Sequence, residues 1–338
     1  MDNIEGRLAL IELIYGYYIT QCIKVAAQLK ISDFLDGRAK SYQELARESQ
    51  SNPDAIWRML RLLKRVGIFE EIEEGVFQNT ELSSFLKSNI EGSLRPLALC
   101  HGGTDLFWQS WRNLDYTIKT GKSASEYCLE ANPFEYLSKN PEVAELFDEA
   151  MSSLSALDTT TICDRYDFSQ FNKIVDVGGG RGELLMSILE QNSSLEGILF
   201  DQQHVVDKVY SILKNRGLLE RCSLEAGSFF EPVPSGYDAY LLRHIIHDWN
   251  DAQALKILKN CREAMRADSK ILVLEILMET EDEPLVGRFR DLNMLVSMPE
   301  GKERTEQQYS SLYKQAGLQL TQIVTLPSTM SIIEGIAC

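Results

Sequence analysis

The run KIVDVGGGRGELL, at residues 173–185, limits the fold of this chain more than any other feature. It joins an apolar, β-branched stretch to a helix-forming stretch through a glycine turn. Asp176, Gly178, Gly180 and Gly182 form an acid-x-Gly-x-Gly-x-Gly pattern, which lets a bulky adenosyl ligand lie against bare backbone at a helix N-terminus. A dinucleotide fingerprint would place its last glycine at position 183, which is a glutamate here. The pattern therefore predicts a nucleoside-type cofactor.

Further apolar runs follow, and each ends in a polar or small residue. Their spacing predicts an α/β fold with a doubly wound, Rossmann-like parallel sheet, whose carboxyl strand ends form a ligand crevice. Asp201, about 25 residues after Asp176, can accept hydrogen bonds from both ribose hydroxyls, although a helix N-cap is an equally good interpretation. Ser228 and Phe229 follow the next run and can hydrogen-bond and cover an adenine ring.

The last two of these runs lead to groups suited to acid–base chemistry. YDAYLLR leads into His244 and His247, and KILVLE ends at Glu275. Packing hardly explains Glu275, since lone carboxylates are rarely buried without a partner. Because the strand ends share one edge of the sheet, we expect a cofactor site at the first three ends and an acid–base site at the last two. His247 is the candidate base; its alternative is a helix-terminal residue bonded to backbone, and we expect His244 to pack.

Several short motifs together resemble the class I S-adenosylmethionine-dependent O-methyltransferases, of the plant caffeate and bacterial polyketide type. The most specific motifs are VDVGGGRG, the FD that ends at Asp201, GSFF at 227–230, HDWND at 247–251 and GKERT at 301–305. FWQSWRNLDYTIKTG at 107–121 and FDEAM at 147–151 look like the interdomain helices of that family. The resemblance covers nearly the whole chain.

The resemblance implies a role for individual residues. It implies that His247 is the general base, flanked by Glu275 and Glu303. It also implies a set of residues that contact the cofactor and a set that line the substrate pocket. To the first set we add Asp176, Gly180 and Trp249. The expected cofactor-binding residues are Asp176, Gly178, Gly180, Asp201, Ser228, Phe229, Arg243 and Trp249, and the expected substrate-binding residues are Phe147, Met151 and Met294.

Three departures from the family pattern stand out. Ser228 replaces a common Asp and Arg243 a common Lys, but both can still hydrogen-bond, so we expect cofactor binding to survive. The segment between Glu275 and Glu303 is slightly shorter than in the plant enzymes. The substrate therefore does not follow from the resemblance.

The chemistry of methyl transfer supports the same assignment of the base. A displacement at the methyl carbon of a sulfonium needs an electron-rich oxygen in line, and positioning supplies much of the rate. A phenol with a pKa near 10 is mostly protonated at neutral pH, so His247 can take its proton while a carboxylate holds the other ring nitrogen. We expect no metal, because the sequence has no H-x-E, H-x-x-x-H or paired-cysteine spacing.

Composition excludes several classes of protein. The formal charge is −16, which opposes nucleic acid as a partner because phosphate contacts provide most of that affinity. The start lacks a signal peptide, and no apolar run reaches the roughly 18 residues of a membrane span. Seven scattered cysteines are typical of reduced, mostly buried thiols. We therefore expect a cytoplasmic enzyme that contacts neither nucleic acid nor membrane.

The N-terminal third follows another plan. Residues 8–29 are apolar on most sides, which indicates a helix buried on more than one face, with a partner subunit as the cover. A capping box at Ser41, a helix start at Asn52-Pro53 and a hairpin turning at Glu74-Gly75 then follow in the order of a winged helix. In the resembled family this module dimerises and contributes to the partner's substrate pocket. We expect domains at residues 1–100 and 101–338, since Pro96 and a glycine pair break the pattern near 94–103.

These observations favour a homodimeric, metal-independent O-methyltransferase acting on a phenolic or enolic hydroxyl of a small aromatic molecule in secondary metabolism. S-adenosylmethionine would be the cofactor and S-adenosylhomocysteine the product. The main alternative is a non-methylating relative that performs decarboxylation, hydroxylation or cyclisation on the same fold. A winged-helix DNA-binding regulator is a weaker alternative, because the hairpin that would meet phosphate is acidic at Glu70, Glu71, Glu73 and Glu74.

Overall fold

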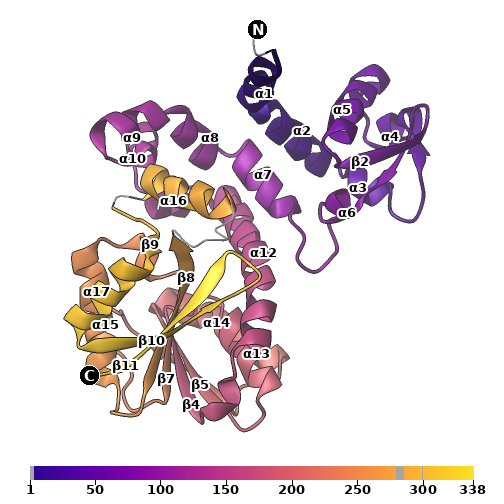
Figure 1. Ribbon diagram of the computed structural model, residues 1–338. Helices are drawn as coiled ribbons and strands as arrows, with labels where there is room; N and C mark the ends of the chain where they lie inside the picture. Colours follow the sequence, from indigo (N-terminus) through magenta and orange to yellow (C-terminus); the bar gives the residue numbers. More distant parts are fainter. Residues whose placement is uncertain (1–3, 279–284, 299) are drawn as a thin grey trace. The chain divides into compact units, whose positions relative to one another are not determined.

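The computed structural model describes residues 4–278, 285–298 and 300–338 (Figure 1). By internal packing the chain forms two units, residues 1–112 with 133–154 and residues 113–132 with 155–338. Three boundaries in the sequence, rather than one, separate these units. The residues near 94–103, where we expect the domain boundary, lie around helix α7, so the division at residue 100 stays a prediction.

The first unit is mainly helical. Its elements are α1 (Ile4–Ile14), α2 (Gly16–Gln28), α3 (Ile31–Phe34), β1 (Lys40–Ser41), α4 (Tyr42–Glu48), α5 (Pro53–Arg65), β2 (Phe69–Glu73), β3 (Val76–Asn79), α6 (Glu81–Ser84), α7 (Arg95–Gly103), α8 (Asp105–Arg112) and α11 (Pro133–Lys139). Helix α12 (Pro141–Arg165) begins in this unit and continues into the second.

The expected winged-helix order is present in the first unit. Ser41 and Glu44 form a capping box at the start of α4, and the Asn52 side chain caps α5, whose first residue is a proline. Strands β2 and β3 form the hairpin, and β1 pairs with β3. Leu60 and Leu63 of α5 are fully buried against Phe69 and Phe77 of the hairpin. Local sequence signals thus set this module, and apolar burial holds it together.

The apolar segment at residues 8–29 forms two helices rather than one. The chain breaks at Tyr15, and α1 and α2 are bent by 41°. Helix α1 has no buried residue; Leu8, Leu13 and Ile14 are each more than half exposed. Among the described residues no single helix is long and apolar enough to cross a membrane, and α1 with α2 meets that test only as a bent pair.

The second unit contains the predicted Rossmann-like sheet, confirming the α/β fold class. Its strand order is β10-β11-β8-β7-β4-β5-β6, with β9 beside β8. The five strands from β4 to β8 run parallel, and β10 and β11 add an antiparallel edge. The strands are β4 (Lys173–Val177), β5 (Glu196–Asp201), β6 (Cys222–Ala226), β7 (Ala239–Arg243), β8 (Lys270–Met278), β9 (Arg304–Thr305), β10 (Leu318–Thr325) and β11 (Met330–Ala337).

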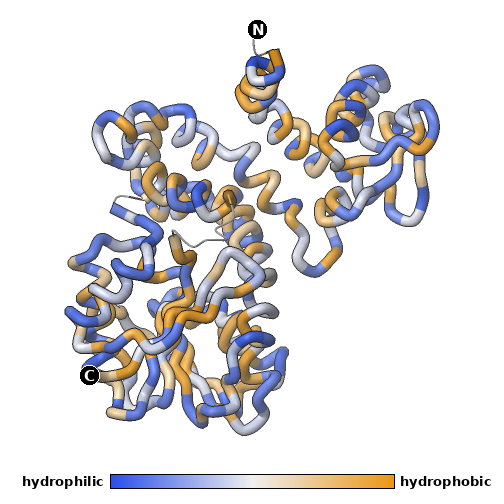
Figure 2. Tube along the Cα trace, in the orientation of Figure 1, coloured by the Kyte–Doolittle hydropathy of each residue, from blue (hydrophilic) through white to orange (hydrophobic). Residues whose placement is uncertain are grey.

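Helices cover both faces of this sheet. Helices α13 and α14 pack on one face and α15 and α17 on the other, so each face of the apolar strands has its own core (Figures 1 and 2). The helices of this unit are α9 (Leu114–Thr120), α10 (Ala124–Leu129), α13 (Glu183–Gln191), α14 (Gln203–Asn215), α15 (Asp251–Ala264), α16 (Leu285–Ser297) and α17 (Glu306–Ala316), with short 3-10 turns η1 (Phe168–Gln170) and η2 (Ile246–Asp248).

The strand order reverses between β4 and β7. In sheets of this kind the ligand crevice opens at the carboxyl ends beside such a reversal. The glycine turn follows β4, and the segment that bears both histidines follows β7. One strand differs from expectation: β8 does not end at Glu275 but continues to Met278, because Ile276 pairs with β11 and Leu277 with β9.

Candidate active site

The glycine turn after β4 adopts backbone angles that favour glycine. Gly178, Gly180 and Gly182 all have positive φ, at 72°, 57° and 77°. A side chain at position 178 would collide with Ile245, whereas one at Gly180 would meet nothing within 4 Å. Gly180 therefore leaves open space in front of the N-terminus of α13, as the approach of a bulky ligand to backbone requires.

Asp201 lies next to this turn. Its Oδ2 accepts a hydrogen bond from the backbone N–H of Gly180 at 2.8 Å, and its Oδ1 accepts one from Gln202 at 2.6 Å. The alternative role as a helix N-cap is wrong, since the N-cap of α14 is Gln202. Each carboxylate oxygen keeps further acceptor capacity, which suits the two hydroxyls of a ribose.

Asp201 also lines a small pocket with the residues after β6. Phe229, Phe230 and Trp249 meet edge to face in this pocket, with ring centroids 4.8 to 6.0 Å apart. The complete lining is Phe200, Asp201, Gln202, Gly227, Ser228, Phe229, Phe230 and Trp249. The structure thus brings together four of the expected cofactor-binding residues, and an aromatic wall of this kind suits a flat heterocycle such as adenine.

Asp176 and Arg243 lie deeper, at the ends of β4 and β7. Burial raises the pKa of the Asp176 carboxyl to about 7, against the opposing charge of Arg243. Arg243 donates to the Thr159 hydroxyl at 2.9 Å and to the Ser155 carbonyl at 2.7 Å, both on α12. Its Nε is buried and has no hydrogen-bond partner, so one donor is left for a ligand.

His247 lies in the η2 turn, buried between two carboxylates. Its Nδ1 is 2.9 Å from Oε1 of Glu303 and 3.3 Å from Oε2 of Glu275. An ionised carboxylate only accepts, so Nδ1 carries the proton and Nε2 is the basic nitrogen of the neutral ring. Nε2 lies 3.5 Å from Oδ1 of Asp248. The structure therefore joins the three residues expected to be catalytic.

Glu275 also fixes the backbone that carries His247. Its Oε1 accepts hydrogen bonds from the N–H groups of Ile245 at 2.9 Å, Ile246 at 2.8 Å and His247 at 3.3 Å. Glu275 is fully buried in the interior of β8, between two paired strands, which limits where its carboxylate can lie. The buried carboxylate that packing did not explain thus accepts from three backbone amides and lies beside the rings of His247 and His244.

The charges around His247 determine its protonation. Burial lowers the pKa of its imidazole, but the charges of Glu275, Glu303 and Asp248 outweigh burial and raise the pKa to about 10. Burial likewise favours the neutral form of Glu275, yet the charge of His247 and the hydrogen bonds to Glu275 hold its pKa below the usual range. The charges around His247 favour its imidazolium form at neutral pH.

Arg304 holds the other side of the η2 turn, and sequence reasoning missed it. Its fully buried guanidinium donates to the carbonyls of Ile246 at 2.8 Å and Trp249 at 2.7 Å, and it binds Asp251 at 2.9 Å. Glu275 thus holds amides and Arg304 holds carbonyls on either side of His247. The sequence signal that could have found Arg304 is its position directly after Glu303 in the motif GKERT.

The three expected substrate-binding residues lie in two units. Met294, on α16, is buried, and its Cε lies near Gly301, which in turn lies near the carbonyl of His247. Phe147 and Met151 lie in the part of α12 that belongs to the first unit, where Phe147 stacks with Phe107 at 6.4 Å. Their role in a substrate pocket stays a prediction.

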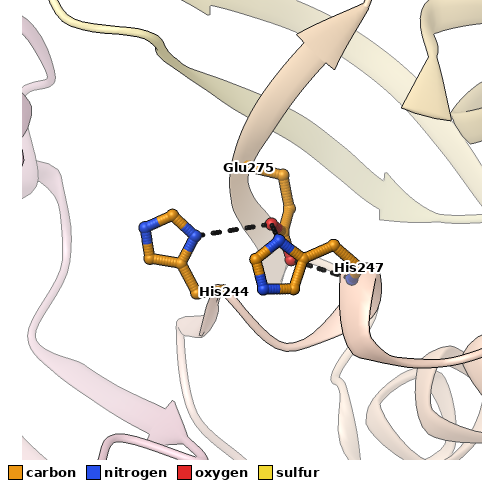
Figure 3. Close-up of side chains that lie close together, drawn as sticks. All are labelled: His244, His247 and Glu275. Carbon is orange, nitrogen blue, oxygen red and sulfur yellow. Dashed lines mark hydrogen bonds and ion pairs between the residues drawn. The ribbon is translucent and has the colours of Figure 1, made fainter. Parts of the chain in front are cut away.

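His244, His247 and Glu275 deserve a separate test for metal binding. One possible ligand atom from each lies within 4.8 Å of the others (Figure 3). The expected absence of a metal stays a prediction. Among the described residues no cysteine forms a disulfide, and Cys100, Cys222 and Cys261 are buried.

Comparison with known families agrees with this geometry. Residues 111–319 match the O-methyltransferase domain, and residues 11–89 match the O-methyltransferase dimerisation domain. The chain belongs to this O-methyltransferase family. The resemblance found in the sequence motifs is confirmed.

Individual relatives span almost the whole chain. Phenazine O-methyltransferase PhzM of Lysobacter antibioticus is 36% identical, over 96% of this chain and 95% of the relative. Phenazine-1-carboxylate N-methyltransferase of Pseudomonas aeruginosa is 30% identical, over 96% of each. The solved structure of NcsB1, an O-methyltransferase in complex with S-adenosylmethionine and 2-hydroxy-5-methyl naphthoic acid, has a TM-score of 0.77 and 31% identity, covering 94% of this chain and 96% of that one.

Family membership fixes the cofactor and the class of reaction. The cofactor of this methyltransferase is S-adenosylmethionine, as the resemblance implied, and it is of the nucleoside type that the glycine turn predicted. The open space at Gly180, the acceptors of Asp201 and the aromatic pocket fit its adenosyl group. Since the relatives include enzymes named for O- and N-methylation, the family leaves the acceptor atom open.

Proposed function

We propose that this protein transfers the methyl group of S-adenosylmethionine to a phenolic or enolic hydroxyl of a small aromatic molecule in secondary metabolism, with His247 as general base. The observation that carries the proposal is the 2.9 Å contact between Nδ1 of His247 and Glu303, which leaves Nε2 as the basic atom. An oxygen acceptor must lose a proton during transfer, whereas a tertiary ring nitrogen has none to lose. A dedicated base therefore favours oxygen.

The basicity of His247 suits a phenol. A proton moves most readily between groups of similar pKa, and the pKa of His247, about 10, is close to that of an ordinary phenol. In the reactive state the phenol oxygen and the His247 imidazole together carry one dissociable proton fewer than when both groups are fully protonated. Because both groups are protonated below pH 10, this state becomes more populated as pH rises.

The remaining roles follow the expected assignments. Asp176, Gly178, Gly180, Asp201, Ser228, Phe229, Arg243 and Trp249 bind the cofactor, and Phe147, Met151 and Met294 contact the substrate. A match to a dimerisation domain supports a homodimer. The names of the phenazine and naphthoate relatives support a planar aromatic substrate.

N-methylation is the second candidate, because a relative at 30% identity carries that name. Incubation with methyl-labelled S-adenosylmethionine and matched pairs of acceptors decides between them: catechols, naphthols and hydroxyphenazines against the corresponding amines and ring nitrogens. Each reaction is run with excess EDTA and, in parallel, with an added divalent ion and no EDTA, since the proposed chemistry needs no metal. The carbon chemical shift of the labelled methyl group distinguishes an O-methyl from an N-methyl product.

We expect O-methyl products that form equally well in EDTA. Methylation of nitrogen alone would contradict the proposal, and dependence on an added divalent ion would contradict the metal-free site. Conversion of an acceptor without transfer of label would instead support a non-methylating relative.

A further inference from the structure

His244, which no role above uses, has an unusual backbone. It directly follows β7 and has φ of 53°, in the left-handed region that few residues other than glycine adopt. Its N–H donates to the carbonyl of Leu274 on β8 at 3.2 Å, which holds it there. Strained residues of this kind persist where the surroundings fix them, and they cluster at functional sites. The conformation directs the ring toward Glu275 (Figure 3).

The His244 ring lies between two buried carboxylates. Its Nε2 is 3.9 Å from Oδ2 of Asp158 on α12, and its Nδ1 is 3.7 Å from Oε2 of Glu275. The ring also stacks on His247, with centroids 5.2 Å apart and planes inclined by 26°. Asp158, His244, Glu275 and His247 therefore form a row in which carboxylates and imidazoles alternate.

Two atoms in this row lack a hydrogen bond. Nδ1 of His244 and Oε2 of Glu275 are both buried without a partner, and they face each other. Glu275 uses Oε1 for three backbone amides, so Oε2 is the oxygen left for the two imidazoles. Unpaired buried polar atoms are costly, and hydrogen bonds at catalytic sites often shorten only when substrate binds.

We propose that His244 is a positioning residue, which holds Oε2 of Glu275 against the ring of His247 and links both to helix α12. The link continues through Arg243, which lies 3.9 Å from Asp158 and donates to two further residues of α12. His244 shares the negative charge of Glu275 with His247. Without His244, Oε2 of Glu275 would face the ring of His247 alone, while Oε1 would keep its three backbone amides. The charged and titratable groups around this row are Asp158 of α12, Arg243 of β7, His247 and Asp248 of η2, Glu275 of β8, and Glu303, which directly precedes β9.

Three full-length variants test this role, which rests on the proposed function of His247. His244→Gly removes the ring and accepts the positive φ, so backbone strain does not confuse the result. His244→Asn tolerates the same φ and keeps a short donor. His204→Asn makes a matched change at an exposed histidine of α14.

Loss of a partner that orients another catalytic group typically costs about 10-fold or more, so we expect His244→Gly to lower kcat about 10-fold. The KM for S-adenosylmethionine should stay within about twofold, because His244 does not line the aromatic pocket. His244→Asn should recover part of kcat, and His204→Asn should match the parent. In the parent and each variant, NMR of labelled histidine rings follows the protonation of His247. In His244→Gly the His247 ring should stay protonated to a higher pH than in the parent.

The NMR measurement separates this inference from the proposed function. A parent that methylates no oxygen would overturn the proposed function, while the His247 signal would still report on His244. Unchanged kcat and unchanged His247 protonation in His244→Gly would overturn the positioning role. A loss of thermal stability alone would also overturn it, since that is the mark of simple packing. Should His244→Gly not fold, the same comparison with His244→Asn decides.

Discussion

Glu275 and His247 meet twice, once through the backbone and once through the ring. Oε1 of Glu275 accepts the His247 N–H at 3.3 Å, and Oε2 lies 3.3 Å from Nδ1 of the same residue. A single carboxylate thus fixes both the position and the charge of the imidazole.

Asp201→Asn should weaken S-adenosylmethionine binding by roughly 1.5–3 kcal/mol, the range for losing hydrogen bonds to a charged group. The substitution keeps the shape of the side chain but removes the charge and one acceptor oxygen. Titration calorimetry measures the affinity. Asp207→Asn, at an exposed position of α14, is the control. Equal affinities for both variants would show that Asp201 does not bind the ribose.

His247→Ala should lower turnover by roughly 10²–10⁴-fold, the usual contribution of a positioned acid–base group. The loss should shrink with more acidic phenols, because these are already ionised and need no base. The measurement is rate against phenol pKa for parent and variant, and Glu275→Gln should show a smaller loss of the same kind. Parallel lines for parent and His247→Ala would mean that His247 is not the base.

Glu303→Gln should move the pH dependence of kcat/KM. The Glu303 charge is one of those that raise the pKa of His247 to about 10, so its removal should lower that pKa. The kcat/KM of the parent should climb as pH rises toward 10. The kcat/KM of the variant should level off at a more acidic pH, and at a smaller maximum value. Glu306→Gln, exposed on α17, serves as control. An inflection that stays in place would contradict the role of Glu303.

Stability should fall at alkaline pH because of the same histidine. The pKa of His247 in the folded protein is raised from 6.5 to about 10, so the folded state binds the proton more tightly than the unfolded state. The stabilisation is complete below pH 6.5 and is lost as pH rises through 10. Thermal unfolding between pH 6 and about 10.5 should show a steeper decline for the parent than for His247→Asn. If the stability of both proteins declined in parallel with pH, the raised pKa of His247 would be refuted.

Leu13→Glu should disrupt the proposed dimer. Leu13 is 78% exposed on α1, a helix with no buried residue in its own chain, and a charge there would oppose burial against a second copy. Light scattering gives the molar mass of parent and variant. Glu12→Gln, a neighbouring change on the same helix, should remain dimeric. A stable dimer with Leu13→Glu would place the interface elsewhere.

Much of the fold could be predicted because its signals are local. The glycine turn, the capping box at Ser41 and the Asn52-Pro53 helix start depend on residues within a few positions of one another, and all three appear as expected. The break at Tyr15 was missed, because the hydrophobic pattern runs on through residues 8–29. The end of β8 was misplaced for another reason: its last residues are set by pairing with distant strands.

The sequence by itself determined the family, the cofactor and the edge of the sheet on which chemistry gathers, since strand ends and short motifs carry that information. Only the tertiary structure decided how closely the expected carboxylates approach His247, and that Arg304 holds the same turn. Glu303 and Arg304 are far from it in sequence, and their contacts exist because β9 pairs beside β8 and α15 begins next to η2. Protonation depends on burial and on distances of a few ångströms, and folding alone sets these.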